Sequence, residues 1–242
     1  MAQYTEMKAY LEPVEVEQLE QAAEYLRDKL LIRLLFRLGC RISEALGIAV
    51  DDIDFNRGTV TIEHLKVRVK LSCPQCATRL SKTARFCPGC GVKVEKAVAE
   101  EKEHRHQRTL PVDENTLAML REYIDRGGPI QTNGKQLLFG LKRSQASNII
   151  KECANRAGLG PLVNPETGEL RGISPHRLRD AFAVHAVKVD DSTDSVRMLQ
   201  EHLGHQSIVT TMKYRKISGE EQKEWYEKLW GGSIGEKNGN TA

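Results

Sequence analysis

The chain has 242 residues, of which 40% are hydrophobic and 29% are charged, as in an ordinary water-soluble globular protein. Its formal net charge of +3 is too small to indicate a polyanion-binding protein by itself. The longest apolar run, 30–39, contains Arg33 and Arg37 and is far shorter than the roughly 20 apolar residues that span a bilayer. Because no basic-then-apolar signal segment opens the sequence, we expect a cytoplasmic protein without membrane contact.

The N-terminal part of the sequence predicts helices followed by a small sheet. Leu, Ile and Ala recur at helical spacing over 15–46, with acidic residues early and basic residues late. The alternating, β-branched residues of 59–62 predict a strand that leads into a second one near 67–71. A charged run, 95–108, then precedes another short strand, which we expect at 108–112.

From Asp113 onward the sequence predicts helices. Asp113 is a candidate N-cap for a helix that runs to Arg126, where a Gly-Gly-Pro sequence stops it. The Gly- and Asn-rich tail, 231–242, is expected to be disordered. Further helices are expected at 144–157, at 175–189 with Pro175 in the first turn, and at about 194–202, 207–214 and 220–230.

Four cysteines lie in one short segment. Cys73 and Cys76, with Cys87 and Cys90, form the pattern C-x2-C-x10-C-x2-C. Two such pairs complete a tetrahedral shell of four thiolates, for which zinc is the default metal. Two disulfides are the alternative, but a cytoplasmic chain keeps its thiols reduced. We therefore predict an inserted zinc ribbon over 71–95, in which one structural Zn²⁺ ion supplies most of the folding energy.

Three short motifs, taken in order, resemble the boxes of the tyrosine recombinase (phage integrase) family. Residues 39–46, Gly-Cys-Arg-Ile-Ser-Glu-Ala-Leu, resemble the family's first arginine box. Residues 174–179, Ser-Pro-His-Arg-Leu-Arg, resemble its His-x-x-Arg box. Residues 203–205, Leu-Gly-His, are followed by Tyr214 at the spacing that the family has in its last box. The resemblance spans about residues 11–217 apart from the cysteine-rich insert.

The resemblance implies an α+β, mainly α-helical tyrosine recombinase catalytic fold with a small antiparallel sheet. The catalytic domain would cover 11–230 as two pieces, 11–70 and 96–230, with the zinc ribbon inserted between them. Its substrate would be double-stranded DNA, so the protein would be associated with the nucleoid. Only about ten residues precede this domain. A separate partner could therefore supply the helical core-binding domain that family members carry.

The resemblance also implies a role for each residue of the boxes. Arg41 and Arg179 would clamp the scissile phosphate, because a planar guanidinium makes bidentate contacts to oxyanions. Tyr214 would attack the phosphorus, which gives a 3′-phosphotyrosyl link and a free 5′-hydroxyl. Rejoining then needs neither a metal nor a nucleotide cofactor, since the link conserves the energy of the phosphodiester. His176 and His205 would hydrogen-bond phosphate oxygens and assist proton transfer.

Four further residues complete or modify the implied site. The family places its general acid, a lysine, on the hairpin between the second and third strands. Lys66 is the corresponding residue, with Lys70 as the alternative. Glu44 occupies an acidic family position, for which a supporting role is implied. Asp180 stands where many relatives have histidine, so we expect the tuning of the site to differ here.

The last predicted helix, 220–230, has an apolar face that includes Trp225, Tyr226 and Trp230. It could pack on its own core. The resemblance implies instead that it docks into a neighbouring protomer and gives a homo-oligomer on DNA.

Three functions of different kinds remain open. The leading interpretation is a site-specific DNA recombinase or integrase. The alternative is a DNA-binding accessory or regulatory protein that keeps the fold without completing strand exchange. The complete set of box residues favours the enzyme, while the missing core-binding domain favours the accessory protein. A zinc-ribbon interaction module is a third and weaker interpretation, because the ribbon is a small part of the chain.

Overall fold

The computed structural model describes residues 8–81, 83–164, 167–215, 226 and 229, with the backbone alone described for 64–70 and 100–106. These residues form two compact units. The first contains residues 1–41 and 144–242, and the second contains residues 42–143. No helix in the described parts of the chain is both long enough and apolar enough to cross a membrane.

The first unit is almost entirely helical. Its aliphatic core includes Leu30, Leu31, Leu34 and Leu35 of α2, all with 0% exposure, and α2 packs against α1 and α6. The helices are α1 (Pro13–Gln21), α2 (Leu26–Arg37), α5 (Arg143–Arg156), α6 (Pro175–Val189), α7 (Thr193–Leu203) and α8 (Ile208–Met212), followed by the short turn η2 (Lys213–Arg215). A two-stranded ribbon, β7 (Leu162–Val163) with β8 (Leu170–Arg171), precedes α6.

Local sequence signals fix where the helices of this unit begin and end. Pro175 occupies the first turn of α6, where its missing N–H leaves no bond unmade. Ser192 caps α7 by accepting a hydrogen bond from the backbone N–H of Ser195. Gly204 ends α7 with φ +66°, a left-handed conformation that glycine adopts without strain. The residue after this stop is His205, so the helix end sets its position.

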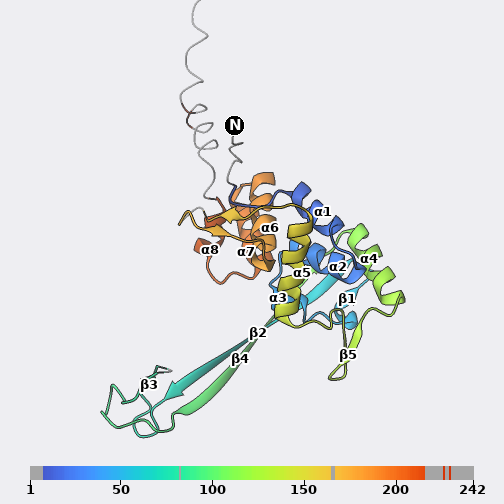
Figure 1. Ribbon diagram of the computed structural model, residues 1–242. Coiled ribbons are helices and arrows are strands. Elements are labelled where there is room, and N and C mark those ends of the chain that lie inside the picture. Colours follow the sequence, from blue (N-terminus) through green and yellow to red (C-terminus); the bar gives the residue numbers. More distant parts are fainter. Residues whose placement is uncertain (1–7, 82, 165–166, 216–225, 227–228, 230–242) are drawn as a thin grey trace, which may run out of the picture. The chain divides into compact units, whose positions relative to one another are not determined.

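The second unit is built on an antiparallel hairpin (Figure 1). Strands β2 (Thr59–Ser72) and β4 (Val98–Pro111) pair along their whole length, from Thr59 opposite Pro111 to Ser72 opposite Val98. The remaining elements are α3 (Ile42–Ala45), η1 (Val50–Asp52), β1 (Ile53–Asp54), β3 (Arg79–Leu80), α4 (Glu114–Asp125), β5 (Ile130–Thr132) and β6 (Lys135–Leu137). Strands β1 and β3 pair with opposite ends of β2.

The long hairpin differs from the sequence prediction. Two short strands at 59–62 and 67–71 were expected, but β2 is continuous over 14 residues. The charged run 95–108, expected to precede a short strand, forms most of β4. The prediction was wrong because a ladder of backbone hydrogen bonds tolerates charged side chains when a partner strand is present. A strand of 14 residues spans roughly 45 Å, so the hairpin carries the cysteine-rich segment far from its base.

The predicted helices agree better with the structure. The side chain of Asp113 accepts the N–H of Thr116 at 3.0 Å and so caps α4 as predicted. The helices expected at 144–157 and 175–189 are α5 and α6, and those near 194–202 and 207–214 are α7 and α8. The expected helix at 220–230 lies almost wholly outside the described residues, and the tail 231–242 lies entirely outside them.

Candidate active site and four-cysteine cluster

Arg179 is the centre of the candidate site. It projects from the first turns of α6, and only 2% of its surface is exposed. Its Nη1 donates to the carbonyl oxygen of Gly39 at 2.6 Å, and its Nη2 donates to that of Leu203 at 2.8 Å. Nη2 also lies 3.1 Å from Nε2 of His205. These contacts come from two separate segments, one at Gly39 and one at 203–205, and they hold the guanidinium in one orientation.

His205 is held from both sides of its ring. Its Nδ1 lies 2.9 Å from Oγ1 of Thr211, a residue with no exposed surface. Its backbone oxygen accepts a hydrogen bond of 3.0 Å from the side-chain amide of Gln200. The imidazole stacks on the ring of Tyr214, with the ring centroids 6.2 Å apart. His205 therefore links the candidate arginine to the candidate nucleophile.

Tyr214 lies in η2, directly after α8, and donates its hydroxyl proton to Oδ1 of Asp180 at 2.9 Å. Burial raises the pKa of the Tyr214 hydroxyl well above its usual value, and the negative charge and hydrogen bond of Asp180 raise it further. The positive charge of Arg179 acts in the opposite direction. In this arrangement the hydroxyl is a phenol and not a phenolate.

Asp180 has several partners on its own helix. Its Oδ2 forms an ion pair with Nη1 of Arg177 at 3.0 Å. Its Oδ1 lies 3.7 Å from Nε2 of His176, whose side chain is 70% exposed. The structure thus brings His176 and Tyr214 to the same carboxylate. In the sequence, Asp180 stands out only as a departure from the usual family residue, and no local pattern marks Arg177 as its partner.

Arg41 belongs to the same unit and is partly buried. It follows Gly39, whose carbonyl oxygen binds Arg179. Gly39 has φ +53°, and a Cβ placed there would lie only 2.4 Å from the ring of Phe182. The glycine of the first arginine box is therefore required for this close approach to α6.

Glu44 forms an ion pair with Arg108 inside the second unit. Nη2 of Arg108 is 2.7 Å from Oε2 of Glu44, and Nη1 is 3.3 Å from Oε1, which gives a bidentate contact. Only 2% of Glu44 is exposed. The pair joins α3 to β4, so a structural role fits Glu44. Arg108 was not identified from the sequence, because nothing local marks it as the partner of a residue in another element.

Lys66 lies in the middle of β2, where the backbone register pairs it with His104 of β4. The alternative, Lys70, is paired with Glu100. Both lysines belong to the second unit, whereas the other candidate catalytic residues belong to the first. Lys66 therefore remains a prediction from the family resemblance.

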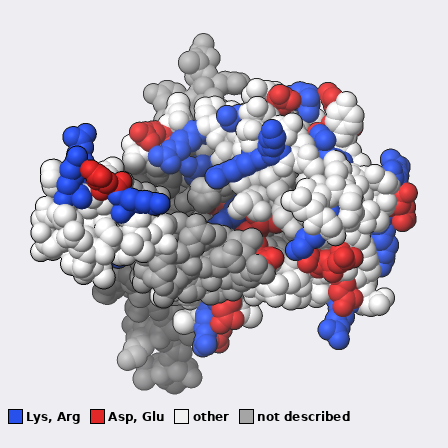
Figure 2. All heavy atoms as spheres, turned by 90° about the horizontal axis from the view of Figure 1, so that it is seen from below, with Lys and Arg blue, Asp and Glu red and all other residues white. Residues whose placement is uncertain are grey.

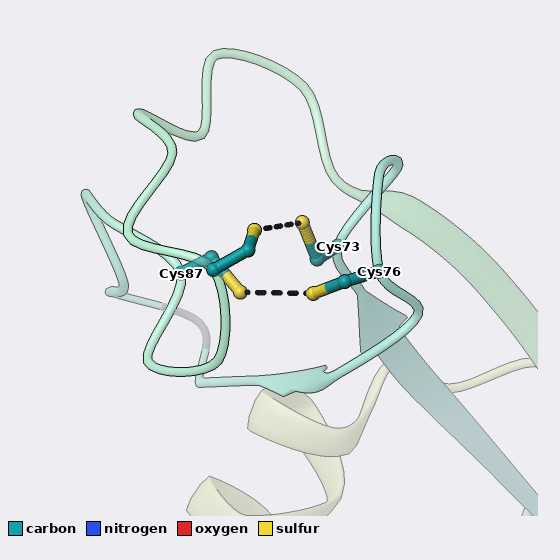
Figure 3. A group of neighbouring side chains, drawn as sticks. Cys73, Cys76 and Cys87 are labelled. Carbon is teal, nitrogen blue, oxygen red and sulfur yellow. Dashed lines mark hydrogen bonds between the residues drawn. The ribbon is translucent and has the colours of Figure 1, made fainter.

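The four cysteines of the insert form one cluster near the far end of the hairpin (Figure 3). Their sulfur atoms all lie within 4.8 Å of one another. The Sγ atoms of Cys73 and Cys90 are 3.7 Å apart, and those of Cys76 and Cys87 are 3.4 Å apart. Four thiolates at about 2.3 Å from a tetrahedral ion would be about 3.8 Å apart. The cluster therefore has nearly the dimensions of a metal site.

The two cysteine pairs lie on equivalent turns. The N–H of Ala77 donates to the carbonyl of Cys73 at 2.9 Å, and that of Gly91 donates to the carbonyl of Cys87 at the same distance. Both Ala77 and Gly91 have positive φ, at 57° and 71°. This repeat is the local geometry by which each pair directs two thiols to one point. Four close cysteines of this kind could hold a metal ion.

Thr78 adds a polar contact at one of these thiols. Its hydroxyl lies 3.1 Å from Sγ of Cys76. Hydrogen bonds with Thr78 lower the pKa of the Cys76 thiol to about 6, whereas contact with the neighbouring cysteine sulfurs raises the pKa of the Cys90 thiol. The direction of the change at Cys76 favours the thiolate, which is the form that binds metal.

A buried arginine, a histidine and a partly buried tyrosine lie together around one helix and form a site suited to phosphoryl transfer. The sequence profile of the phage integrase family matches residues 9–85 and 75–221, and the chain belongs to that family. The expected fold class is thereby confirmed: an α+β, mainly helical tyrosine recombinase catalytic fold.

Named relatives agree with this assignment. Tyrosine recombinase XerD of Corynebacterium glutamicum is 30% identical over 215 residues, which are 86% of this chain and 53% of that protein. The chain thus spans about half the length of the curated relatives that it matches. The crystal structure of XerA recombinase matches with a TM-score of 0.60 at 19% identity, covering 93% of this chain and 66% of that one.

A structure with DNA is also similar. XerH site-specific recombinase bound to palindromic difH substrate, in a post-cleavage complex, matches with a TM-score of 0.56 at 20% identity. The match covers 94% of this chain and 56% of that one. At these identities the solved structures demonstrate a shared fold.

Proposed function

We propose that the chain is the catalytic domain of a site-specific DNA recombinase or integrase. It cleaves and rejoins double-stranded DNA through a 3′-phosphotyrosyl intermediate. The observation that carries the proposal is the linkage of Arg179, His205 and Tyr214 by direct contacts around α6. DNA as the substrate is supported by the relatives named as recombinases and by the DNA complex of XerH.

In this mechanism Arg41 and Arg179 bind the non-bridging oxygens of the scissile phosphate. Two backbone carbonyls and His205 orient Arg179 before DNA arrives, so little reorganisation is needed in the transition state. The oxygen of Tyr214 forms a bond to phosphorus while the bond to the 5′-oxygen breaks. Lys66 gives its proton to that leaving oxygen, and the proton of the Tyr214 hydroxyl passes to the imidazole of His176.

The two histidines have different surroundings and therefore different roles. His205 is fixed between Thr211 and Arg179, and it serves to position and hydrogen-bond the phosphate. His176 has a side chain that is 70% exposed at the start of α6, where it can reach DNA. It assists proton movement at the phosphate.

Binding of the polyanion does not depend on the overall charge of the chain. Figure 2 shows basic and acidic side chains intermingled on one face. The net charge is only +3. A partner that supplies a core-binding domain would add DNA contacts. The nucleoid is then the place where the protein acts.

We propose one structural Zn²⁺ ion in a ribbon over 71–95, with Cys73, Cys76, Cys87 and Cys90 as its ligands. The sulfur separations and the paired turns support zinc. The ribbon interrupts a catalytic domain that covers 11–70 and 96–230. The zinc has no step in the DNA chemistry, since four thiolates leave no position for a substrate.

We also propose that the protein forms a homo-oligomer on DNA through the segment 220–230, for which the sequence predicts a helix. Tyr226 and Leu229, which are described, are 59% and 51% exposed. A chain truncated before Glu220 should sediment as a smaller species on DNA than the full chain. Equal sedimentation of the two chains would contradict this assembly.

The test of the function is trapping of the covalent intermediate. The substrate is a DNA duplex from the protein's native genomic surroundings, with labelled strands and a nick beside the cleavage site. Cleavage releases a short fragment, and the loss of this fragment prevents rejoining. Wild type should form a labelled adduct that survives denaturing electrophoresis, and Tyr214→Phe should form none. The matched control is Tyr25→Phe, which removes the hydroxyl of a tyrosine that is 64% exposed.

The accessory-protein alternative gives a different result in the same experiment. It predicts measurable DNA binding by the wild type without any adduct, even when a relative's core-binding domain is added in trans.

A further inference from the structure

We propose that Asp180 is a positioning residue that holds the hydroxyl of Tyr214 as a hydrogen-bond donor in the DNA-free protein, and that Tyr214 must leave Asp180 before it attacks DNA. Arg177 fixes Asp180 in this role. The inference rests on the proposed function, in which Tyr214 is the nucleophile. It adds a resting state of the site and assigns two residues to it.

The geometry of the carboxylate supports this role. Asp180 is 5% exposed, and its two oxygen atoms have different partners. Oδ2 binds Arg177 at 3.0 Å, while Oδ1 accepts the Tyr214 hydroxyl at 2.9 Å. Arg177 and Asp180 are one helical turn apart on α6, so their contact is set by the helix itself. The carboxylate would thus keep a partner after Tyr214 had moved away.

The groups around the Tyr214 hydroxyl favour its protonated form. From α6, the charge and hydrogen bond of Asp180 raise the pKa of Tyr214, and Arg179 lowers it. Tyr10, in the N-terminal segment, raises it slightly, and the ring of His205 stacks alongside. Burial is the largest cause, and it also acts to raise the pKa. The resting position therefore suppresses formation of the phenolate.

Attack on phosphorus requires that the hydroxyl of Tyr214 is no longer held in its protonated form. The tyrosine oxygen must lose its proton as its bond to phosphorus forms, and the 5′-oxygen must gain one as its own bond breaks. A carboxylate beside the nucleophile would also repel the incoming phosphate. The alternative is that Asp180 itself accepts the tyrosine proton as a general base. Arg177 holds Oδ2 of Asp180 at 3.0 Å and so fixes the carboxylate as a hydrogen-bond acceptor, which favours the resting role.

Asp180→Asn distinguishes the resting role of Asp180 from a general-base role. Asparagine has nearly the same shape and can still accept a hydrogen bond, but it carries no charge. The first measurement is tyrosinate absorbance against pH, taken as the difference between each protein and its Tyr214→Phe counterpart. We expect Tyr214 to ionise at lower pH in Asp180→Asn than in wild type. An unchanged titration would overturn the proposal, and this readout does not depend on DNA cleavage.

The second measurement is the rate of adduct formation on the nicked DNA at saturating concentration. For Asp180→Asn we expect cleavage about two- to tenfold faster, the range that corresponds to replacing a charge-assisted hydrogen bond by a weaker neutral one. The pH-rate profile should also shift to lower pH. Cleavage slowed by about a hundredfold or more would instead identify Asp180 as a general base and reject the resting role.

Two further variants keep the test decisive. Asp180→His removes the carboxylate with a different side chain and should change both readouts in the same direction, even if asparagine impairs folding. Asp190→Asn is the matched control, since Asp190 ends the same helix and binds the backbone of Ser192 instead of Tyr214. It should change neither readout. Absence of an adduct in wild type would count against the proposed function, while the titration would still decide the role of Asp180.

Discussion

The carbonyl oxygen of Gly39 accepts a hydrogen bond of 2.6 Å from Nη1 of Arg179, across 140 residues of sequence. This bond fastens the segment that carries Arg41 to the helix that carries Arg179. The two arginines that are proposed to clamp one phosphate are therefore coupled through the backbone of a single glycine. The same glycine touches Phe182 of α6 so closely that no side chain fits between them.

Gly39→Ala should destabilise the protein and weaken cleavage together. The new Cβ would lie 2.4 Å from the Phe182 ring, and the backbone has φ +53°, which disfavours alanine. We expect a loss of about 2–4 kcal/mol in the free energy of unfolding, from overpacking plus backbone strain. Denaturant unfolding measures this loss. Gly158→Ala is the control. Gly158 has φ +67°, but a Cβ placed there would have no atom within 4 Å, so this variant should lose only the stability that backbone strain costs. Equal losses for the two variants would show that the contact with Phe182 is unimportant.

Arg108→Ala should be strongly destabilising, because it leaves the carboxylate of Glu44 buried without its ion-pair partner. Glu44 is 2% exposed, and removing one member of a buried pair costs about 3–5 kcal/mol. Thermal or denaturant unfolding measures the change. Arg126→Ala breaks an ion pair with Glu122 whose side chains are 68% and 49% exposed, and it should have little effect. Similar results for both variants would contradict a structural role for the Glu44 pair.

These residues show how far the sequence can predict such a site. Pro175, Asp113 and Gly204 act within one or two helical turns, and their effects on helix ends could be predicted. The contact of Tyr214 with Asp180 joins residues 34 positions apart, and that of Arg108 with Glu44 joins residues 64 apart. Each of these two contacts depends on how helices and strands that are distant in sequence pack together. The sequence carries no local signal for such packing.

Removing the metal should disorder the ribbon without unfolding the helical unit. The ribbon's small core consists of Cys73, Leu80 and Cys87 with partly buried neighbours, which is too little apolar surface to fold without an ion. Purified protein should contain one zinc per chain, and Cys87→Ser should contain none. Cys153→Ala, which alters a buried cysteine outside the cluster, should retain the zinc. Folded protein that lacks zinc and keeps an ordered ribbon would refute the assignment.

Lys66→Ala tests the one catalytic assignment that lies in the other unit. If Lys66 protonates the leaving 5′-oxygen, its loss should slow cleavage of ordinary DNA by about a hundredfold or more. A substrate with sulfur at the bridging 5′ position should be cleaved at nearly the wild-type rate, since a thiolate leaves without a proton. Lys70→Ala is the matched control on the same strand, and it should cleave both substrates normally. If Lys66→Ala lost the same cleavage rate on both substrates, Lys66 would act in DNA binding and not as the acid. If Lys70→Ala lost cleavage rate on ordinary DNA alone, Lys70 would be the acid.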